Sequence, residues 1–364
     1  MLGVKAVPAI GGIQLYTEEV GKRLVARGHQ VRVYCRRQYM ENGAAPDYCG
    51  LTRRLTPGIR GKHLDALTHT ATAAWHCRRH PVDVAHFHGI GPTAFAPLVR
   101  RGGRTRIVIT IHGLDWQRQK WGRAARACLR STARASLRWA DAVTAVSRSV
   151  QRFYREQFGQ EIAYVPSGIT PQSPEPPEEI LKLGLEPGQY LLYLARLVPE
   201  KGSHYLLQAF RELGTDQRLV IAGGSNYRDP YVDRLRGMAD ERVLFPGYVR
   251  GRLQRELYAH AYLYVLPSDL EGLPLTILEA LSYGRCVLAS DIEPNVEALG
   301  GCGYTFRQGD VADLRQHLAH LLERPDLVAA ETEKAQTYIA RERNWETTTD
   351  AFEQLYGQLL GRAA

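Results

Sequence analysis

Two glutamates flanking a tight turn form the segment of this chain best suited to chemistry. The segment SDLEGLPLTILEA, residues 268–280, places Glu271 and Glu279 eight positions apart. The residues that make the turn and open a predicted helix are Gly272, Leu273, Pro274 and Leu275. Free N–H groups at a helix N-terminus bind anions, whereas carboxylates repel phosphate and suit hydroxyl groups. The segment therefore predicts a site for a ligand that carries phosphate together with sugar or ribose hydroxyls. A glutamate that merely stabilises a helix N-terminus is the simpler interpretation, but it accounts for Glu271 alone.

A pair of cations follows another predicted strand. The sequence RLVPEKG runs from Arg196 to Gly202, directly after the predicted strand at residues 190–195. Arg196 and Lys201 are predicted to hold a diphosphate at the end of this strand. Gly202 allows the next helix to start close to the sheet. An exposed Lys-Gly pair at a helix start is the alternative interpretation of Lys201 and Gly202.

Two glycines, Gly11 and Gly12, precede a predicted helix that begins near Leu15. Glycines at a helix N-terminus let the backbone approach a phosphate closely. The pattern differs from the GxGxxG fingerprint of dinucleotide-binding proteins. Gly12 is therefore a predicted phosphate contact of the first half of the chain.

Three histidines stand at predicted strand ends. His86 and His88 lie in the sequence HFHG, and His112 ends the next predicted strand. An HxH pair can bind a metal, but no third ligand stands nearby in the sequence. Packing at the strand end or contact with a substrate is the favoured interpretation of His86 and His88, and no metal site is predicted. A hydrogen-bonded strand-end residue is the alternative to a functional role for His112.

Length and composition indicate an ordinary globular chain. At roughly 150 residues per domain, 364 residues indicate about two domains. Apolar residues make up 44% and charged residues 23%, which excludes wholesale disorder. No apolar run approaches the ~18 residues needed to cross a bilayer, and no secretory signal is recognisable. The six cysteines form no CxxC pair, so we expect reduced thiols and a cytoplasmic protein.

Charge is distributed unevenly along the chain. Residues 1–170 hold 27 basic and 10 acidic residues, whereas residues 171–364 hold 20 and 28. The densest basic stretch runs from Arg118 to Arg138 and repeats arginine every fourth residue over its last four arginines. A helix of this kind suits an anionic membrane surface, and a solvated helix face is the alternative. Nucleic acid is not predicted as a partner, because no recognised binding motif is present.

The strands and helices alternate along both halves. We predict strands at residues 29–35, 82–88, 106–112, 142–146, 162–165, 190–195, 218–222, 242–245, 261–266 and 286–289. This alternation predicts an α/β protein with two doubly wound, Rossmann-like parallel sheets that face a cleft. The predicted parts are a first domain at 1–168, a Pro- and Glu-rich linker at 169–189, a second domain at 190–343 and a final helix at 344–364.

The chain resembles the retaining GT-B glycosyltransferases of family 4, in particular enzymes of bacterial surface-polysaccharide synthesis. The matching pieces are GGIQLYTEEVGKRLVARGHQVRVYC, TIHGLD, AVSRSV, VPSGI, ARLVPEKG, VIAGG and SDLEGLPLTILEALSYGRCVLASDI. The stretch HGLDWQRQKWGR resembles the surface-polysaccharide subgroup. Residues 344–360 resemble the last helix of the family, which returns to the first domain. The sequence differs from the family pattern at its start, where the leading strand is nearly missing. It also differs at Gln14 and Ser167, where the family often has Glu and Asn.

The resemblance implies a role for each candidate residue. Arg196 and Lys201 would neutralise the leaving diphosphate, Glu279 would bind the ribose and Glu271 would hold hydroxyls of the donor sugar. His112 would lie near the reacting sugar and the acceptor. Phosphate or sugar contacts are implied for Gly12 and the backbone of Gly272, Leu273, Pro274 and Leu275. The backbone of residues 245–249, including Gly247 and Tyr248, would line the pocket of the base.

The implied activity is that of a retaining hexosyltransferase. It would move a sugar from a nucleoside-diphosphate sugar to a glycan or lipid-linked acceptor. The chain contains no D-x-D pair, so we expect fixed cations and N–H groups, and no metal or other cofactor, to meet the charge of the leaving group. The basic first domain favours an acceptor at the inner face of the cell membrane. The alternatives are a nucleotide-sugar epimerase of the same fold and an inactive homologue that only binds nucleotide sugar.

Overall fold

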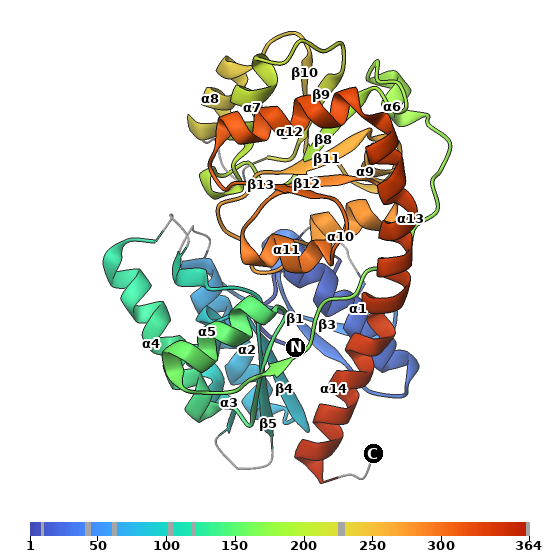
Figure 1. The fold of residues 1–364 in the computed structure, drawn as a ribbon. Coiled ribbons are helices and arrows are strands. Elements are labelled where there is room, and N and C mark those ends of the chain that lie inside the picture. The colour runs from blue at the N-terminus through green and yellow to red at the C-terminus, as the bar shows by residue number, and fades with distance from the viewer. Residues whose placement is uncertain are drawn as a thin grey trace. The chain divides into compact units, whose positions relative to one another are not determined.

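A computed structural model describes residues 1–8, 11–40, 45–59, 64–100, 105–117, 121–224 and 230–361. The chain divides into two compact units (Figure 1). The first unit comprises Met1–Gly168 and Trp345–Ala364, and the second comprises Ile169–Asn344. The segment expected to be a separate linker, residues 169–189, is thus part of the second unit.

The first unit contains two small sheets. One has the strand order β1-β3-β2 and consists of β1 (Arg32–Arg36), β2 (Asp47–Tyr48) and β3 (Leu51–Thr56). The other is parallel, has the order β4-β5-β6-β7 and consists of β4 (Val84–His88), β5 (Arg106–Ile111), β6 (Ala142–Ala145) and β7 (Ala163–Tyr164). β1 and β3 are parallel and β2 is antiparallel to β3, so one short strand departs from the expected parallel arrangement.

The N-terminal segment joins the two sheets. The backbone N–H of Leu2 donates to the carbonyl of His86 at 2.8 Å, and His88 donates to Leu2 at 2.9 Å. On the other side, Tyr34 of β1 donates to the carbonyl of Met1. The segment forms one β-bridge, between Leu2 and Phe87, and occupies the place of a strand between β1 and β4.

Helices pack on these sheets. Those of the first unit are α1 (Gly12–Ala26), α2 (Leu64–Arg79), α3 (Ala96–Arg100), α4 (Arg123–Trp139), α5 (Arg148–Phe158) and α14 (Trp345–Leu360), with 3-10 turns η1 (Arg37–Tyr39), η2 (Gly91–Phe95) and η3 (Asp115–Gln117). The packing of the last helix, α14, ties the end of the chain to its beginning.

α14 lies along α1 (Figure 1). Arg27 of α1 bridges Glu346 and Glu353 of α14 at 2.9 Å each, and Phe352 is fully buried. Burial of Phe352 and these ion pairs explain why the end of the chain folds with its beginning.

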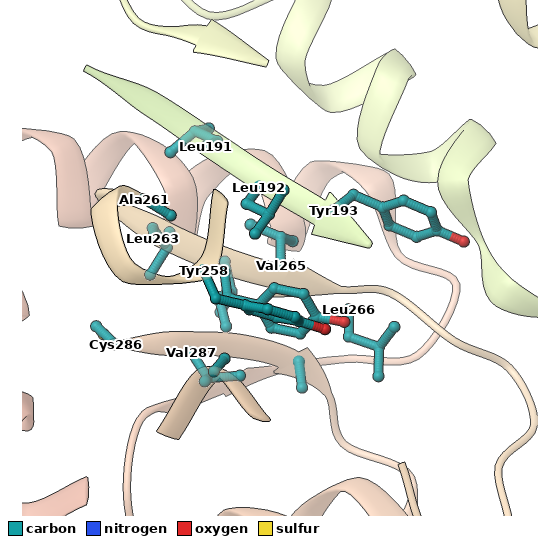
Figure 2. Packing of buried hydrophobic residues seen from close by; sticks show 14 of the residues in the cluster. Leu191, Leu192, Tyr193, Tyr258, Ala261, Leu263, Val265, Leu266, Cys286 and Val287 are labelled. Atoms are coloured by element: carbon teal, nitrogen blue, oxygen red, sulfur yellow. The ribbon is translucent and has the colours of Figure 1, made fainter. Parts of the chain in front are cut away.

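The second unit is built on one parallel sheet of order β10-β9-β8-β11-β12-β13. Its strands are β8 (Tyr190–Leu194), β9 (Arg218–Ala222), β10 (Val243–Gly247), β11 (Leu263–Leu266), β12 (Val287–Ser290) and β13 (Tyr304–Phe306). The central strands are nearly continuous apolar runs, as expected for a sheet covered on both faces. Figure 2 shows side chains of β8, β11 and β12, such as Leu191, Val265 and Val287, gathered with Tyr258 in this core.

The helices of the second unit are α6 (Glu179–Lys182), α7 (Ser203–Arg211), α8 (Pro230–Met238), α9 (Gly251–His260), α10 (Leu275–Ser282), α11 (Glu293–Leu299), α12 (Val311–Glu323) and α13 (Pro325–Glu342), with the 3-10 turn η4 (Pro199–Lys201). Glu256 of α9 is buried, and its Oε2 accepts N–H groups of Glu178, Glu179 and Ile180. These hydrogen bonds hold the pKa of Glu256 at about 2 despite burial. The carboxylate thus caps α6 and fixes the Pro-rich segment to the second unit.

The predicted fold class, α/β with two Rossmann-like units, is confirmed, and each of the ten predicted strands overlaps an observed one. No strand was predicted between residues 36 and 81, where β2 and β3 lie. β3 reads LTRRLT, and its Arg53 is buried and donates to the carbonyl of Val7 at 3.1 Å. A buried charged residue hides the apolar alternation that identifies a strand. The strand β13 was also missed.

Four cysteines are buried, whereas Cys49 and Cys128 are exposed, and all six are free thiols. Among the helices that the structure describes, none combines the length and the apolar character that a membrane span requires.

Candidate active site

Lys201 and Glu271 form an ion pair in the second unit. Lys201 ends η4 after β8, and Glu271 follows β11, which is the neighbour of β8 in the sheet. Their side chains are 13% and 7% exposed, so the pair is largely withdrawn from water. The hydroxyl of Ser268 donates to the same carboxylate oxygen at 2.8 Å. Neighbouring parallel strands therefore bring together a cation and a carboxylate that are 70 residues apart in the sequence.

Two glycines make this close approach of loops possible. Gly202 has a φ of +70°, and a Cβ on it would lie 1.8 Å from the carbonyl oxygen of Pro267. Gly223 has a φ of +136°, and a Cβ there would lie 1.8 Å from the carbonyl oxygen of Ala195. Both positions require glycine, because a side chain would clash with backbone that cannot move independently of the sheet.

The turn after Glu271 leads into α10, as the sequence predicts. Pro274 is the N-cap residue, and it supplies no side-chain hydrogen bond to the first turn. The first turn of α10 also lacks acidic residues. The N–H groups and the positive end of the helix dipole at Leu275 are therefore suited to an anionic ligand.

Glu279 lies on α10 and is bound by a residue that sequence reasoning missed. The hydroxyl of Tyr258 on α9 donates to Oε2 of Glu279 at 2.8 Å. Burial raises the pKa of Glu279 to about 7, although the hydrogen bond from Tyr258 opposes this shift. No sequence pattern pairs these residues, which lie 21 positions apart on two different helices.

Arg196, Gly247 and Tyr248 lie around the ends of β8 and β10. The carbonyl of Gly247 accepts a hydrogen bond from the N–H of Gly223 at 2.8 Å. Tyr248 is 46% exposed, and its ring packs close to Gly224, where a Cβ would lie 2.7 Å from Cε2 of the ring. Burial raises the pKa of Tyr248, and the positive charge of Arg196 works in the opposite direction, which places the guanidinium near the phenol. An exposed aromatic ring and a cation thus stand at one edge of the sheet.

Gly12 and His112 lie in the first unit. Gly12 begins α1, and Gly11 before it has a φ of +133°. Tyr16, one turn along α1, is fully buried, and its ring meets that of His112 edge to face at 4.9 Å. Burial lowers the pKa of His112 to about 4, so its imidazole is neutral at pH 7. The helix that Gly12 opens therefore packs directly against His112.

His86 and His88 are buried side chains of β4. The two ring nitrogens of His86 contact the hydroxyls of Tyr356 and Thr110, each at 2.6 Å. Nδ1 of His88 lies 3.1 Å from Nε2 of His112. These contacts favour packing at the strand end for His86, and no group of metal ligands occurs in the parts of the chain that the structure describes.

The predicted basic helix is α4. Its five arginines, which are all exposed, are Arg123, Arg126, Arg130, Arg134 and Arg138. The predicted basic residues Arg118 and Lys120 lie outside the described residues. Arg130 donates to the side-chain oxygen of Gln157 at 3.3 Å. The helix presents a row of cations to solvent.

Comparisons with known proteins agree with this architecture. The model of Glycosyltransferase Family 4 matches residues 10–173, and that of Glycosyl transferases group 1 matches residues 177–343. The chain is similar to a GDP-mannose-dependent alpha-(1-6)-phosphatidylinositol monomannoside mannosyltransferase of Mycolicibacterium smegmatis, with 30% identity over 89% of this chain and 88% of the relative. It is also 24% identical to the N-acetyl-alpha-D-glucosaminyl L-malate synthase of Bacillus anthracis, over 99% of this chain and 97% of that enzyme.

Solved structures share the fold. Sucrose-phosphate synthase of Thermosynechococcus elongatus has a TM-score of 0.83 at 20% identity, covering 96% of this chain and 94% of that one. Anabaena Alr3699/HepE, solved with UDP and glucose, has a TM-score of 0.81 at 18% identity and covers 98% of both chains. The two Rossmann-like units thus have the GT-B fold of these glycosyltransferase structures. The family models and the full-length relatives show that the chain belongs to glycosyltransferase family 4, which confirms the resemblance seen in the sequence.

Proposed function

We propose that this glycosyltransferase moves a sugar from a nucleoside-diphosphate sugar to a glycan or lipid-linked acceptor, with retention of anomeric configuration and without a metal. The proposed setting is the synthesis of cell-surface polysaccharide or glycoconjugate. The observation that carries the proposal is the largely buried Lys201–Glu271 pair next to the turn that opens α10. This ion pair places a cation suited to phosphate beside a carboxylate suited to hydroxyl groups.

The leaving diphosphate needs positive charge that is in place before the bond breaks. Lys201 is held by Glu271, so its ammonium group is oriented without having to be ordered by the ligand. Arg196 and the N–H groups at the start of α10 add donors that suit phosphate oxygens. Such preorganised donors stabilise charge as it develops in the transition state, which is the task a metal performs in other transferases.

The carboxylates would recognise the two sugar rings of the donor. Glu271 is acceptor-only when ionised, so it can hold hydroxyls of the transferred sugar. Glu279 has one oxygen engaged by Tyr258, and its second oxygen is proposed to accept from the ribose hydroxyls. The exposed ring of Tyr248 and the backbone at Gly247 are proposed to border the base.

The names of the similar proteins support a nucleotide-sugar donor. The mannosyltransferase of Mycolicibacterium smegmatis is GDP-mannose-dependent and acts on a phosphatidylinositol mannoside, and Alr3699/HepE was solved with UDP-glucose. We therefore propose a hexose as the transferred sugar and take GDP-mannose and UDP-glucose as the first donors to test. His112, which presents a neutral imidazole, is proposed to contact the reacting sugar or the acceptor.

We further propose that the enzyme works at the cytoplasmic face of the membrane. The exposed arginines of α4 suit anionic lipid headgroups. Attraction to such a surface contributes about 1 kcal/mol of binding free energy for each basic residue near it. Sedimentation with vesicles of phosphatidylglycerol, compared with phosphatidylcholine, tests this binding. Substituting Arg126, Arg130 and Arg134 together by Glu should release the protein from the anionic vesicles. Equal sedimentation of this variant would contradict the proposal.

The activity test uses the full chain with each nucleotide sugar, excess EDTA and a lipid extract as the source of acceptors. The expected result is release of nucleoside diphosphate that depends on the acceptor and persists in EDTA, with a product whose anomeric configuration matches the donor. Conversion of the nucleotide sugar in the absence of acceptor would indicate an epimerase. Binding of nucleotide without release or conversion would indicate an inactive homologue.

A further inference from the structure

His88 and His112 form a hydrogen-bonded pair of imidazoles in the first unit. Nδ1 of His88, at the end of β4, lies 3.1 Å from Nε2 of His112, which follows β5. β4 and β5 are adjacent parallel strands, with His88 in register with Thr110. The pairing therefore follows from the register of the sheet.

Both rings are neutral, so one of the two facing nitrogens must carry a proton and donate it in the hydrogen bond to the other. Burial lowers the pKa of His88 well below its usual value, and it lowers the pKa of His112 to about 4. In a neutral imidazole one nitrogen is a donor and the other is an acceptor. Either His88 donates from Nδ1 or His112 donates from Nε2, and the choice fixes the tautomer of both rings.

The environment of His88 selects between these alternatives. His88 is 1% exposed, and its Nε2 has no hydrogen-bond partner among the residues that the structure describes. A buried N–H without an acceptor is rare and costly, whereas an under-used acceptor is tolerated more often. The proton of His88 therefore lies on Nδ1, where it has an acceptor in His112.

Neighbouring rings keep His88 in this orientation. Its ring stacks on that of His86 at 4.3 Å, and the edge of Tyr16 meets it at 6.0 Å. His86 is itself held at both nitrogens by the hydroxyls of Tyr356 and Thr110. A flip of the His88 ring would break its hydrogen bond to His112 and disturb this stack.

We propose that His88 is a positioning residue that holds His112 in its Nδ1–H tautomer. His112 then offers an N–H donor at Nδ1, and it is not a general base there. Since His112 is only partly buried, this donor is suited to an oxygen of the transferred sugar or of the acceptor hydroxyl. The meaning of this donor for catalysis rests on the proposed function, whereas the tautomer does not.

Imidazole nitrogen NMR tests the tautomer directly. The full chain is labelled with ring-15N histidine, and the His112 signals are identified by their loss in His112→Ala. Long-range proton–nitrogen spectra distinguish an Nδ1–H from an Nε2–H ring. The expected wild-type result is a neutral His112 with its proton on Nδ1. A His112 signal of the Nε2–H type in the wild-type protein would overturn the proposal.

Three variants separate positioning from general packing. His88→Leu removes the donor and should move His112 toward the Nε2–H tautomer or a mixture. His88→Asn can place its amide N–H where Nδ1 lies and should restore the wild-type pattern. His69→Leu on α2 is the control, because it removes a buried imidazole of the first unit that makes no hydrogen bond to His88 or His112, and the His112 signal should keep its tautomer. An unchanged tautomer in His88→Leu would contradict the proposal.

Kinetics then connect the tautomer to transfer. With an identified donor and acceptor, His88→Leu should lower kcat about tenfold, the effect of one hydrogen bond, and His88→Asn should recover most of it. Failure of the wild-type enzyme to transfer sugar would count against the proposed function and leave the tautomer result standing. A tautomer that changes in His88→Leu with kcat unaltered would overturn the role of the N–H donor.

Discussion

The hydroxyl of Tyr258 donates a hydrogen bond to Oε2 of Glu279 at 2.8 Å, inside the second unit. Tyr258 is 2% exposed, and its ring stacks with Tyr283 at 6.1 Å. One oxygen of the carboxylate is thereby fixed from the protein side. Under the proposed function the other oxygen meets the ribose, so Tyr258 would orient the group that recognises the nucleotide.

Glu279 should make donor binding depend on pH. Burial raises its pKa to about 7, so the carboxylate gains a proton as the pH falls through 7 and loses its ability to accept from ribose at both oxygens. We expect the Kd of a nucleoside-diphosphate sugar to rise between pH 8 and pH 6 and to change little in Glu279→Gln. Calorimetry with the intact nucleotide sugar is suitable, because its diphosphate carries no proton that titrates in this range. A pH dependence that persists in Glu279→Gln would assign the effect to another group.

Removing the Tyr258 hydroxyl should weaken nucleotide binding and shift its pH dependence. Tyr258→Phe removes the hydrogen bond that lowers the pKa of Glu279, so the midpoint should move to higher pH. The loss of one hydrogen bond predicts a Kd increase of about fivefold at pH 8. Tyr283→Phe is the control, because Tyr283 stacks on the same ring and its hydroxyl contacts Gln172 instead. Equal effects of the two variants would indicate general packing.

Substituting Lys201 should remove donor turnover while the protein stays folded. Lys201→Ala takes away the proposed cation of the leaving group and leaves Glu271 beside the diphosphate, so we expect kcat to fall about 100- to 1,000-fold. Glu279→Ala should also abolish turnover through loss of donor binding. Lys182→Ala is the control, since Lys182 is exposed and pairs with Glu179 on α6. Undiminished activity in both Lys201→Ala and Glu279→Ala would refute the site assignment.

Gly202→Ala should destabilise the protein. The residue has a φ of +70°, and its Cβ would lie 1.8 Å from the carbonyl oxygen of Pro267, so the loop that carries Lys201 must move. We expect a loss of more than about 1 kcal/mol in the free energy of unfolding, measured by urea denaturation. Gly237→Ala on α8 is the matched control, because an added Cβ would point into open space and alanine favours a helix. If Gly202→Ala is as stable as Gly237→Ala, the backbone at Pro267 leaves room for a side chain at position 202, and the prediction is wrong.

The sequence by itself determined the repeating strand–helix pattern and the local chemistry of each turn. Apolar runs such as Leu191–Tyr193 show their burial directly, because strands covered on both faces need no polar residues. The turn at Gly272–Leu275 was also readable, since its residues and the helix it opens are neighbours in the chain. Strand β3 was not, because its buried Arg53 finds its partner at Val7, far away in the sequence.

The tertiary structure alone decided which side chains meet. Lys201 contacts Glu271 because β8 and β11 are neighbours in the sheet, although β9 and β10 lie between them in the chain. His88 contacts His112 because of the register of β4 and β5. Tyr258 of α9 contacts Glu279 of α10 because the two helices pack together. Strand order, register and helix packing depend on many weak contacts over the whole chain. No local residue pattern encodes them, which is why the partners that tune these site residues become visible only in the folded protein.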